Sequence, residues 1–180
     1  MKEGAMLKEG QEAPDFTLKD DRGNEVSLAD YAGRKFVLYF YPKDDTPGCT
    51  AEACDFRDEY AEFRTRGIDI VGVSADSPES HAKFKDKHHL NFALLSDPEK
   101  KVLIAYGVWK EKSMYGKKFM GVERMTFIIA DGQIMKIYPR VKVGGHIDDI
   151  LKTFGHLKTF ARSEVKATQS QGVRDHADRA

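Results

Sequence analysis

Two cysteines, Cys49 and Cys54, lie five positions apart, and the chain of 180 residues contains no others. Two thiols placed close together and used nowhere else suggest redox chemistry. An apolar run over residues 36–41 precedes them, and it leads through a loop rich in proline, aspartate and glycine into a helical pattern. We therefore expect Cys49 in the first turn of a helix, at the end of a buried strand.

The chemistry of a thiol depends on its ionised form, because only the thiolate attacks and a free cysteine is mostly protonated at neutral pH. The first turn of a helix stabilises the anion through unpaired backbone N–H groups and the positive end of the helix dipole. Arg124 is the candidate for an additional cation, since it places a permanent charge on the same face as Val122 and Thr126 within a β-rich pattern. The alternative is that Arg124 is a charge on an edge strand that prevents aggregation.

Two residues before the first cysteine have both a chemical and a structural interpretation. Thr46 lies three residues before Cys49, so its hydroxyl can approach the sulfur in a tight loop. Thr46 followed by Pro47 is also an ordinary pair of helix cap and first helical residue. Pro42, taken alone, terminates the preceding strand. Both interpretations of Thr46 can hold together.

The spacing of the cysteines limits how they can react with each other. Residues five apart on an α-helix have Cα atoms about 8.6 Å apart and side chains about 140° apart around the axis. A disulfide generally needs Cα atoms within about 7 Å. If Cys49 and Cys54 form a disulfide, the first turns of the helix must therefore unwind. In the intact helix, Cys49 projects near an apolar core stripe and Cys54 projects away from it.

The elements around this loop predict an α/β protein. Residues 36–41 and 68–73 are apolar runs, as central strands are when helices cover both faces of a sheet. Between these runs, apolar side chains recur at the helical spacings of three and four. These side chains are Ala53, Phe56, Tyr60 and Phe63. The two strands and the helix between them form a β-α-β unit.

Shorter patterns extend this unit into a thioredoxin-like fold, a central mixed β-sheet flanked by helices, with an N-terminal hairpin and insertions. The Asp131-Gly132 pair predicts the turn of a second hairpin, and a final apolar stripe predicts a C-terminal helix. The predicted ranges are 16–18 and 26–28 for the first hairpin, 122–130 and 134–138 for the second, helices from 76–78 and from 96–98 to 107, and the apolar stripe from 147 to 157.

Composition predicts one domain over residues 1–160 and a polar, flexible C-terminal tail over residues 161–180, which has no large apolar residue except two valines. Lysine plus arginine and aspartate plus glutamate balance at 29 each, which does not favour a nucleic-acid or membrane partner. The N-terminus lacks an apolar stretch that could serve as a signal peptide. We therefore expect a cytoplasmic protein, and in that compartment a close cysteine pair is more often catalytic, redox-active or metal-binding than structural.

The motif Pro42-x-x-x-Thr46-x-x-Cys49 resembles the active-site signature of the peroxiredoxins. The longer stretch over residues 39–58 is similar to the bacterioferritin comigratory protein subfamily, also called peroxiredoxin Q. The similarity covers nearly the whole chain from Gly10 to about Leu157. It continues over residues 72–84, 94–98, 105–109, 114–117 and 124–127.

This resemblance implies a thiol peroxidase that reduces hydrogen peroxide and alkyl hydroperoxides. It implies that Cys49 is the peroxidatic cysteine and that Cys54 is the resolving cysteine. Thr46 and Arg124 would orient and polarise the bound peroxide, and Pro42 would shield the reactive sulfur. On this basis the charge on Arg124 has a catalytic reason.

The same resemblance assigns a supporting role to Glu52, which would hold Arg124 in place; the alternative is an acid that the helix dipole favours near the first turn. The implied cycle forms a sulfenic acid on Cys49 and then, after local unwinding, an intramolecular disulfide with Cys54. Thioredoxin or a similar dithiol would reduce that disulfide. We expect this atypical two-cysteine peroxiredoxin to need no metal or organic cofactor and to be a monomer rather than a dimer.

Three other functions fit parts of the sequence. A general thiol-disulfide oxidoreductase usually carries Cys-x-x-Cys, whereas four residues separate these cysteines. A metal-binding module could combine the cysteines with His81, His88, His89 and His146, although these histidines lack helical ligand spacing. A holdase-like binding protein would need exposed apolar patches, of which the charge-rich sequence gives little sign.

Overall fold

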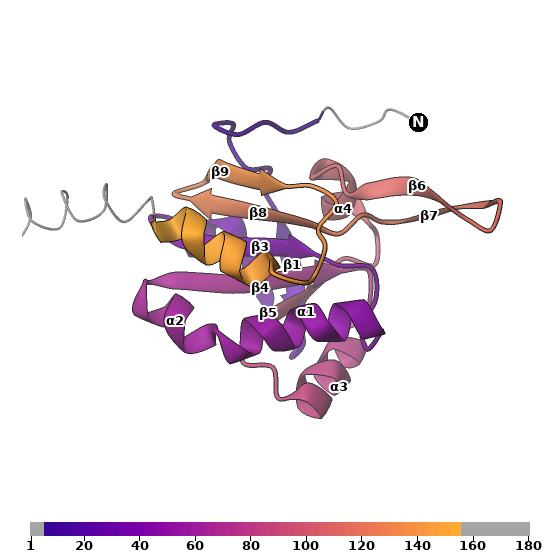
Figure 1. Ribbon diagram of the computed structural model, residues 1–180, viewed down its shortest axis with the longest axis horizontal. Helices are drawn as coiled ribbons and strands as arrows, with labels where there is room; N and C mark the ends of the chain where they lie inside the picture. The colour runs from indigo at the N-terminus through magenta and orange to yellow at the C-terminus, as the bar shows by residue number, and fades with distance from the viewer. Residues whose placement is uncertain (1–5, 156–180) are drawn as a thin grey trace, which may run out of the picture. The chain divides into compact units, whose positions relative to one another are not determined.

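The computed structural model of the protein describes residues 6–155, and the tail predicted over residues 161–180 lies outside this range. The chain divides after Val143 into two compact units. In its described residues, the first unit holds a seven-stranded sheet, a two-stranded sheet and four α-helices (Figure 1). In the second unit, residues 146–155 are helical.

Three parallel strands form the centre of the larger sheet. β3 (Lys35–Phe40) pairs with β4 (Ile68–Ser74), and β4 pairs with β5 (Ala93–Ser96). Five of the six residues of β3 are buried, as the apolar runs predicted. Because the strands are parallel, their carboxyl ends meet at one edge of the sheet, which is where such folds place ligand sites.

Antiparallel strands complete the sheet on both sides. They are β1 (Thr17–Asp20), β2 (Glu25–Ser27), β8 (Met125–Ala130) and β9 (Gln133–Tyr138), and the strand order is β2-β1-β5-β4-β3-β8-β9. The predicted N-terminal hairpin is confirmed as β1 and β2, which a 3-10 turn, η1 (Leu28–Tyr31), follows. Asp131 and Gly132 connect β8 to β9 with φ angles of 47° and 76°, so this Asp-Gly turn is confirmed as well.

Three helices cover one face of the parallel strands (Figure 1). They are α1 (Pro47–Asp58), α2 (Tyr60–Thr65) and α3 (Pro78–His88). Both crossovers, from β3 to β4 and from β4 to β5, run in the same direction across the sheet, and right-handed crossovers of this kind place their helices on the same side. The helix predicted through Phe63 is divided at Glu59 into α1 and α2.

Successive side chains of β3 point to opposite faces of the sheet and pack into two separate layers of the core. On the face that α1 covers, the ring of Tyr39 stacks on Phe56 with centroids 4.6 Å apart. The next residue, Phe40, points to the opposite face and contacts Tyr106 at 5.2 Å. Strands apolar on both faces are therefore explained by packing on both sides of the sheet.

The helix predicted to begin at residues 96–98 begins later, as α4 (Lys101–Ala105). Lys100 has a left-handed backbone conformation, with φ of 63°, so the chain turns before the helix starts. Asp97 nevertheless supports the helix, because its carboxylate accepts hydrogen bonds from the backbone N–H groups of Val102 and Leu103 at 2.9 and 2.8 Å. Asp97 therefore accepts hydrogen bonds from the first turn of α4 although it is not adjacent in sequence to the start of that helix.

The strand predicted over residues 122–130 is present but shorter, as β8 (Met125–Ala130), because Val122 instead ends the preceding strand. β6 (Trp109–Met114) and β7 (Lys117–Val122) form a separate hairpin, which extends away from the larger sheet (Figure 1). Its two-residue turn has positive φ at Tyr115 (52°) and Gly116 (76°), the geometry that suits a tight hairpin. The hairpin also exposes four large apolar side chains: Met114, Tyr115, Phe119 and Met120.

The predicted C-terminal helix is present over residues 146–155, and its residue Leu157 lies outside the described range. Ile147, Ile150 and Phe154 are buried, as the apolar stripe predicted. Within residues 6–155, no helix combines the length and the apolar character that a membrane span requires.

Candidate active site

Cys49 lies in the first turn of α1, as the sequence predicted. Thr46 occupies the N-cap position and Pro47 is the first helical residue. The first helical hydrogen bond runs from the N–H of Thr50 to the carbonyl of Thr46 at 2.8 Å. Cys49 is only 2% exposed, and the backbone N–H groups of this turn have no helical acceptors. A thiolate at this position would therefore lie beside donors that the helix leaves free.

Arg124 reaches this turn from the short link between β7 and β8, not from within a strand. The antiparallel register of β3 with β8 pairs Phe40 with Met125, so the start of β8 lies beside the end of β3. The carbonyl of Arg124 accepts a hydrogen bond from the N–H of Val141 at 2.9 Å. This hydrogen bond therefore fixes the backbone of Arg124, although the residue lies outside the strands.

The guanidinium of Arg124 contacts both the sulfur and a buried carboxylate. Its Nη2 lies 3.4 Å from Cys49 Sγ, and its Nη1 lies 2.7 Å from Glu52 Oε1. Burial opposes the positive charge, but the Glu52 carboxylate and the Cys49 sulfur together raise the pKa of Arg124 above its ordinary value. The side chain that was predicted as the nearby cation therefore stays charged at the sulfur, and an edge-strand role is excluded by its position.

Glu52 is a fully enclosed partner of this arginine, with an exposure of 1%. Burial raises the pKa of the Glu52 carboxyl from 4.5 to about 7, although Arg124 partly offsets the effect. Its second oxygen, Oε2, has no hydrogen-bond partner among the described residues. The geometry agrees with the prediction that Glu52 holds Arg124, and it differs from an exposed first-turn acid.

The hydroxyl of Thr46 does not cap α1. Its Oγ1 donates to the carbonyl of Lys43 at 2.8 Å, and it makes no side-chain hydrogen bond to the amides of the first turn. The cap interpretation is therefore right for the backbone and wrong for the side chain. Because the Thr46 hydroxyl donates its hydrogen to the carbonyl of Lys43, the lone pairs of Thr46 Oγ1 are available to accept a hydrogen bond from an approaching O–H group.

Pro42 and Cys54 lie at the margins of the site. Pro42 is exposed and follows the buried Tyr41, so its role as a shield for the sulfur stays a prediction. Cys54 is half-buried, and both cysteines are free thiols. The helix is continuous from Pro47 to Asp58, which agrees with the expectation that an intact helix keeps these two sulfurs apart.

Two residues at the site were not singled out from the sequence. A Cβ atom added to Gly48 would lie 3.1 Å from Arg124 Nη2, so the missing side chain leaves room for the guanidinium. Lys112 of β6 lies across Gly121 of the hairpin. Burial lowers the pKa of Lys112, and Arg124 lowers it further. A glycine directly before the cysteine was a readable signal, whereas nothing local marks Lys112.

The structure does not favour the metal-binding alternative. Asp44, Asp76 and His81 bring one ligand atom each within 4.8 Å of one another, and among residues 6–155 no such group includes a cysteine. The atoms of this group already face protein partners: Asp44 accepts from Tyr41 and Ser80 at 2.5 and 2.8 Å, and both ring nitrogens of His81 are hydrogen-bonded. A metal ion would have to displace these bonds.

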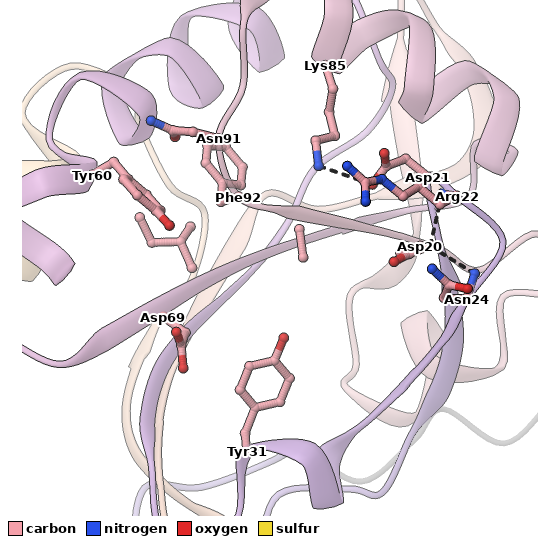
Figure 2. Close-up of a pocket in the computed structure, with 12 residues that line it drawn as sticks. Asp20, Asp21, Arg22, Asn24, Tyr31, Tyr60, Asp69, Lys85, Asn91 and Phe92 are labelled. Carbon is pink, nitrogen blue, oxygen red and sulfur yellow. Dashed lines mark hydrogen bonds and ion pairs between the residues drawn. The ribbon is translucent and has the colours of Figure 1, made fainter.

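A pocket of about 330 Å³ lies in another part of the first unit, and neither cysteine lines it (Figure 2). Two of its carboxylates are held in ion pairs. Asp21 binds Lys85 at 3.1 Å, and Asp69 binds Arg34 at 2.8 Å. Without a cysteine in its lining, this pocket offers no thiol chemistry. Its lining includes Tyr31, Tyr60, Asp69, Lys85, Asn91 and Phe92.

Comparisons with known proteins agree with this geometry. Residues 9–137 match the AhpC/TSA family. Peroxiredoxin Bcp of Bacillus subtilis is 53% identical over 145 residues, covering 80% of this chain and 92% of that protein. Peroxiredoxin Bcp of Escherichia coli is 44% identical, covering 81% of this chain and 94% of that protein.

Solved structures of peroxiredoxin Q extend the comparison to the fold. The structure from Xanthomonas campestris has a TM-score of 0.75 and 42% identity, covering 78% of this chain and 90% of that chain. A further structure is described as addressing the alkyl peroxide reduction activity of the bacterioferritin comigratory protein of Xanthomonas campestris, with the same TM-score of 0.75. The predicted thioredoxin-like fold is confirmed by these similarities.

Proposed function

Because this chain belongs to the AhpC/TSA family and is a thiol peroxidase of the peroxiredoxin type, we propose that Cys49 is the thiol that attacks the hydroperoxide. One observation carries this proposal: Arg124 lies between the Cys49 sulfur, at 3.4 Å, and the Glu52 carboxylate, at 2.7 Å. A cation held in this way stabilises the thiolate and any negative charge that develops on peroxide oxygens beside it.

In the first step, the Cys49 thiolate attacks the terminal oxygen of the hydroperoxide. A sulfur–oxygen bond forms as the oxygen–oxygen bond breaks, and the electron pair of the broken bond leaves with the alkoxide or hydroxide. The leaving group takes a proton and departs as an alcohol or water, while Cys49 becomes a sulfenic acid. Thr46 Oγ1 accepts the O–H of the bound hydroperoxide, and Arg124 faces the developing charge.

In the second step, Cys54 attacks the sulfenic sulfur, a disulfide forms and water leaves. In an intact helix the two Cα atoms are about 8.6 Å apart, and a disulfide needs less than about 7 Å. The first turns of α1 therefore unwind before Cys49 reaches Cys54. The half-buried position of Cys54 suits a thiol that waits for its partner to move.

In the third step, a dithiol reductant such as thioredoxin reduces the disulfide by thiol exchange and is itself oxidised to a disulfide. The electrons of the whole cycle come from thiols, so no step uses a metal or an organic cofactor. Hydrogen peroxide and alkyl hydroperoxides are the proposed substrates, which fits the alkyl peroxide reduction described for the relative from Xanthomonas campestris. Because the disulfide forms within one chain, a monomer is sufficient for the cycle. The proposed location of the protein is the cytoplasm.

Consumption of hydrogen peroxide in the presence of thioredoxin and its reductase tests the proposal. Cys49→Ser should abolish turnover, because serine cannot form the sulfenic acid. Cys54→Ser is the matched control, since it should still consume one equivalent of peroxide per chain and then stop. Unchanged peroxide consumption by a folded Cys49→Ser protein would refute the assignment.

A further inference from the structure

We propose that His81, buried in α3 and outside the reacting groups, is a positioning residue for peroxide reduction. His81 binds Asp44 and thereby fixes the loop that carries Thr46 and leads into the helical turn of Cys49. This contact between His81 and Asp44 is called the clamp below. The inference rests on the proposed role of Cys49. It concerns a group of buried polar residues that the peroxidase chemistry itself does not use.

The two ring nitrogens of His81 both face acceptors, and the residue is fully buried, with an exposure of 0%. Nε2 lies 2.9 Å from the carbonyl oxygen of Leu95, and a carbonyl can only accept, so Nε2 carries a hydrogen. Nδ1 lies 2.7 Å from Asp44 Oδ2. His81 is therefore a bridge from the carbonyl at β5 to the carboxylate of Asp44.

Asp44 is bound by more than this histidine. Its Oδ1 accepts from the hydroxyl of Tyr41 at 2.5 Å, and its Oδ2 accepts from Ser80 Oγ at 2.8 Å. Two hydroxyl donors and His81 Nδ1 therefore surround the side-chain oxygens of Asp44. The backbone N–H of Asp44 also donates to Asp76 Oδ2 at 2.9 Å. Asp44 is thus tied to the residues that follow β3 and β4 and to α3.

Asp44, the anchor of this loop, directly precedes the active-site residues in the sequence. Asp44 is two residues before Thr46 and five before Cys49. The residue between anchor and cap, Asp45, has a left-handed backbone with φ of 57°, a conformation that persists in a non-glycine residue when its surroundings fix it. If the anchor is loosened, the Thr46 hydroxyl and the first turn of α1 lose their fixed position opposite Arg124.

The clamp should affect the two chemical steps in opposite ways. Attack on peroxide needs Cys49, Thr46 and Arg124 held together, and small misplacements of reacting groups are costly in rate. Disulfide formation with Cys54 needs the same segment to leave its position. A weaker clamp therefore slows the first step and does not slow the second, whereas general destabilisation gives no such division.

The neighbouring aspartate provides a matched control. Asp45 binds His88 Nε2 at 3.0 Å, so two consecutive aspartates each pair with a histidine of α3. The side chains of Asp45 and His88 are 46% and 20% exposed, whereas those of Asp44 and His81 are 4% and 0% exposed. Exposed ion pairs contribute little, and a buried charge that loses its partner is destabilising.

The experiment compares His81→Gln with His88→Gln in the full chain, after circular dichroism has established that both are folded. Stopped-flow Trp109 fluorescence follows oxidation of Cys49 and then disulfide formation, and mass spectrometry measures the fraction of sulfinic acid at high peroxide. We expect His81→Gln to slow the peroxide step at least about tenfold, with disulfide formation as fast as in the wild type and a smaller sulfinic fraction. His88→Gln should stay within about twofold of the wild type in both steps.

A further variant keeps the test decisive if His81→Gln does not fold, and a double variant extends the test if it does. Ser80→Ala removes one donor to Asp44 and leaves the His81 pair in place, so it should slow the peroxide step by a few-fold. Asp44→Asn combined with His81→Gln, where folded, should cost less than the product of the single effects, because both changes break the same contact.

An unchanged peroxide step in folded His81→Gln would overturn the inference, as would equal effects of His81→Gln and His88→Gln. An unchanged peroxide step in Ser80→Ala would overturn it as well. Failure of the proposed function itself is distinguishable, because the wild-type protein would then show no peroxide-dependent change at Cys49.

Discussion

Cys49 and Cys54 are the same residue type on the same helix, yet their surroundings differ. Cys49 is 2% exposed in the first turn of α1, where Arg124 lies 3.4 Å from its sulfur. Cys54 lies further along α1 and is half-buried. Position on the helix and one buried cation therefore distinguish the thiol proposed to attack from the thiol proposed to resolve.

Burial alone does not explain the difference between Cys49 and Cys54. Burial in apolar surroundings disfavours a thiolate. At Cys49 it is accompanied by free backbone donors of the helix terminus and by an arginine that Glu52 holds at 2.7 Å. The site thus combines low exposure with stabilisation of negative charge, and changes to the charged groups should act on Cys49 and not on Cys54.

The largest effect is expected for Arg124→Gln, which removes the cation at the Cys49 sulfur. We expect the second-order rate of peroxide reduction to fall about 10²- to 10³-fold, since loss of one transition-state donor typically costs this much. Stopped-flow measurement of the first oxidation step checks it. Arg57→Gln is the control, because Arg57 lies one turn after Cys54 and binds the carbonyl of His88 instead. Similar losses in both variants would remove the distinction between the two cysteines.

The next effect concerns Glu52, whose pKa is raised by burial from 4.5 to about 7. The folded state then holds the proton more tightly than the unfolded state, so its stability contribution is complete below pH 4.5 and is lost as pH rises toward about 7. The free energy of unfolding should fall by on the order of 2 to 3 kcal/mol across this interval on account of Glu52.

Urea unfolding of Glu52→Gln at several pH values measures this contribution. The variant should lack that part of the pH dependence, because glutamine does not ionise. Glu59→Gln changes an exposed glutamate next to the end of the same helix and should retain the wild-type profile. A Glu52→Gln profile identical to the wild type would mean that the carboxyl is not desolvated as described.

The smallest effect is expected for Gly48→Ala. The added Cβ would meet Arg124 Nη2 at 3.1 Å, so the guanidinium must shift by a few tenths of an ångström from the sulfur. We expect a few-fold slower peroxide step with little change in thermal stability. Gly144→Ala is the control, since its Cβ would have no neighbour within 4 Å. A Gly48→Ala rate equal to that of the wild type would show that Arg124 tolerates the contact.

Local patterns predicted the parts of the fold that depend on neighbouring residues. The apolar runs identified β3 and β4, and the cysteine motif located the first turn of α1. The β6–β7 hairpin was missed, because its residues are mostly exposed and show no clear alternation of apolar and polar residues. Its turn pair, Tyr115-Gly116, is also a weaker signal than Asp-Gly. The strand assigned to Arg124 was wrong for the same reason.

The site was predictable only where the chemistry is carried by residues close in sequence. Cys49, Thr46 and Glu52 lie within seven positions, and a permanent charge within a β-rich pattern marked Arg124 before the family motif supported it. The hydrogen bond between Asp44 and His81 joins residues 37 positions apart, and no local periodicity predicts such a pairing. Lys112 likewise approaches the site only because the hairpin folds back beside Arg124.

The most direct test of the account asks which sulfur reacts first. Cys54→Ser protein is treated with one equivalent of hydrogen peroxide and dimedone, which traps sulfenic acids, and Cys49→Ser protein is treated in parallel; peptide mass mapping then locates the label. The account predicts labelled Cys49 in the first protein and no label on Cys54 in the second. A label on Cys54, or an unlabelled Cys49 in a folded protein that consumes peroxide, would contradict it.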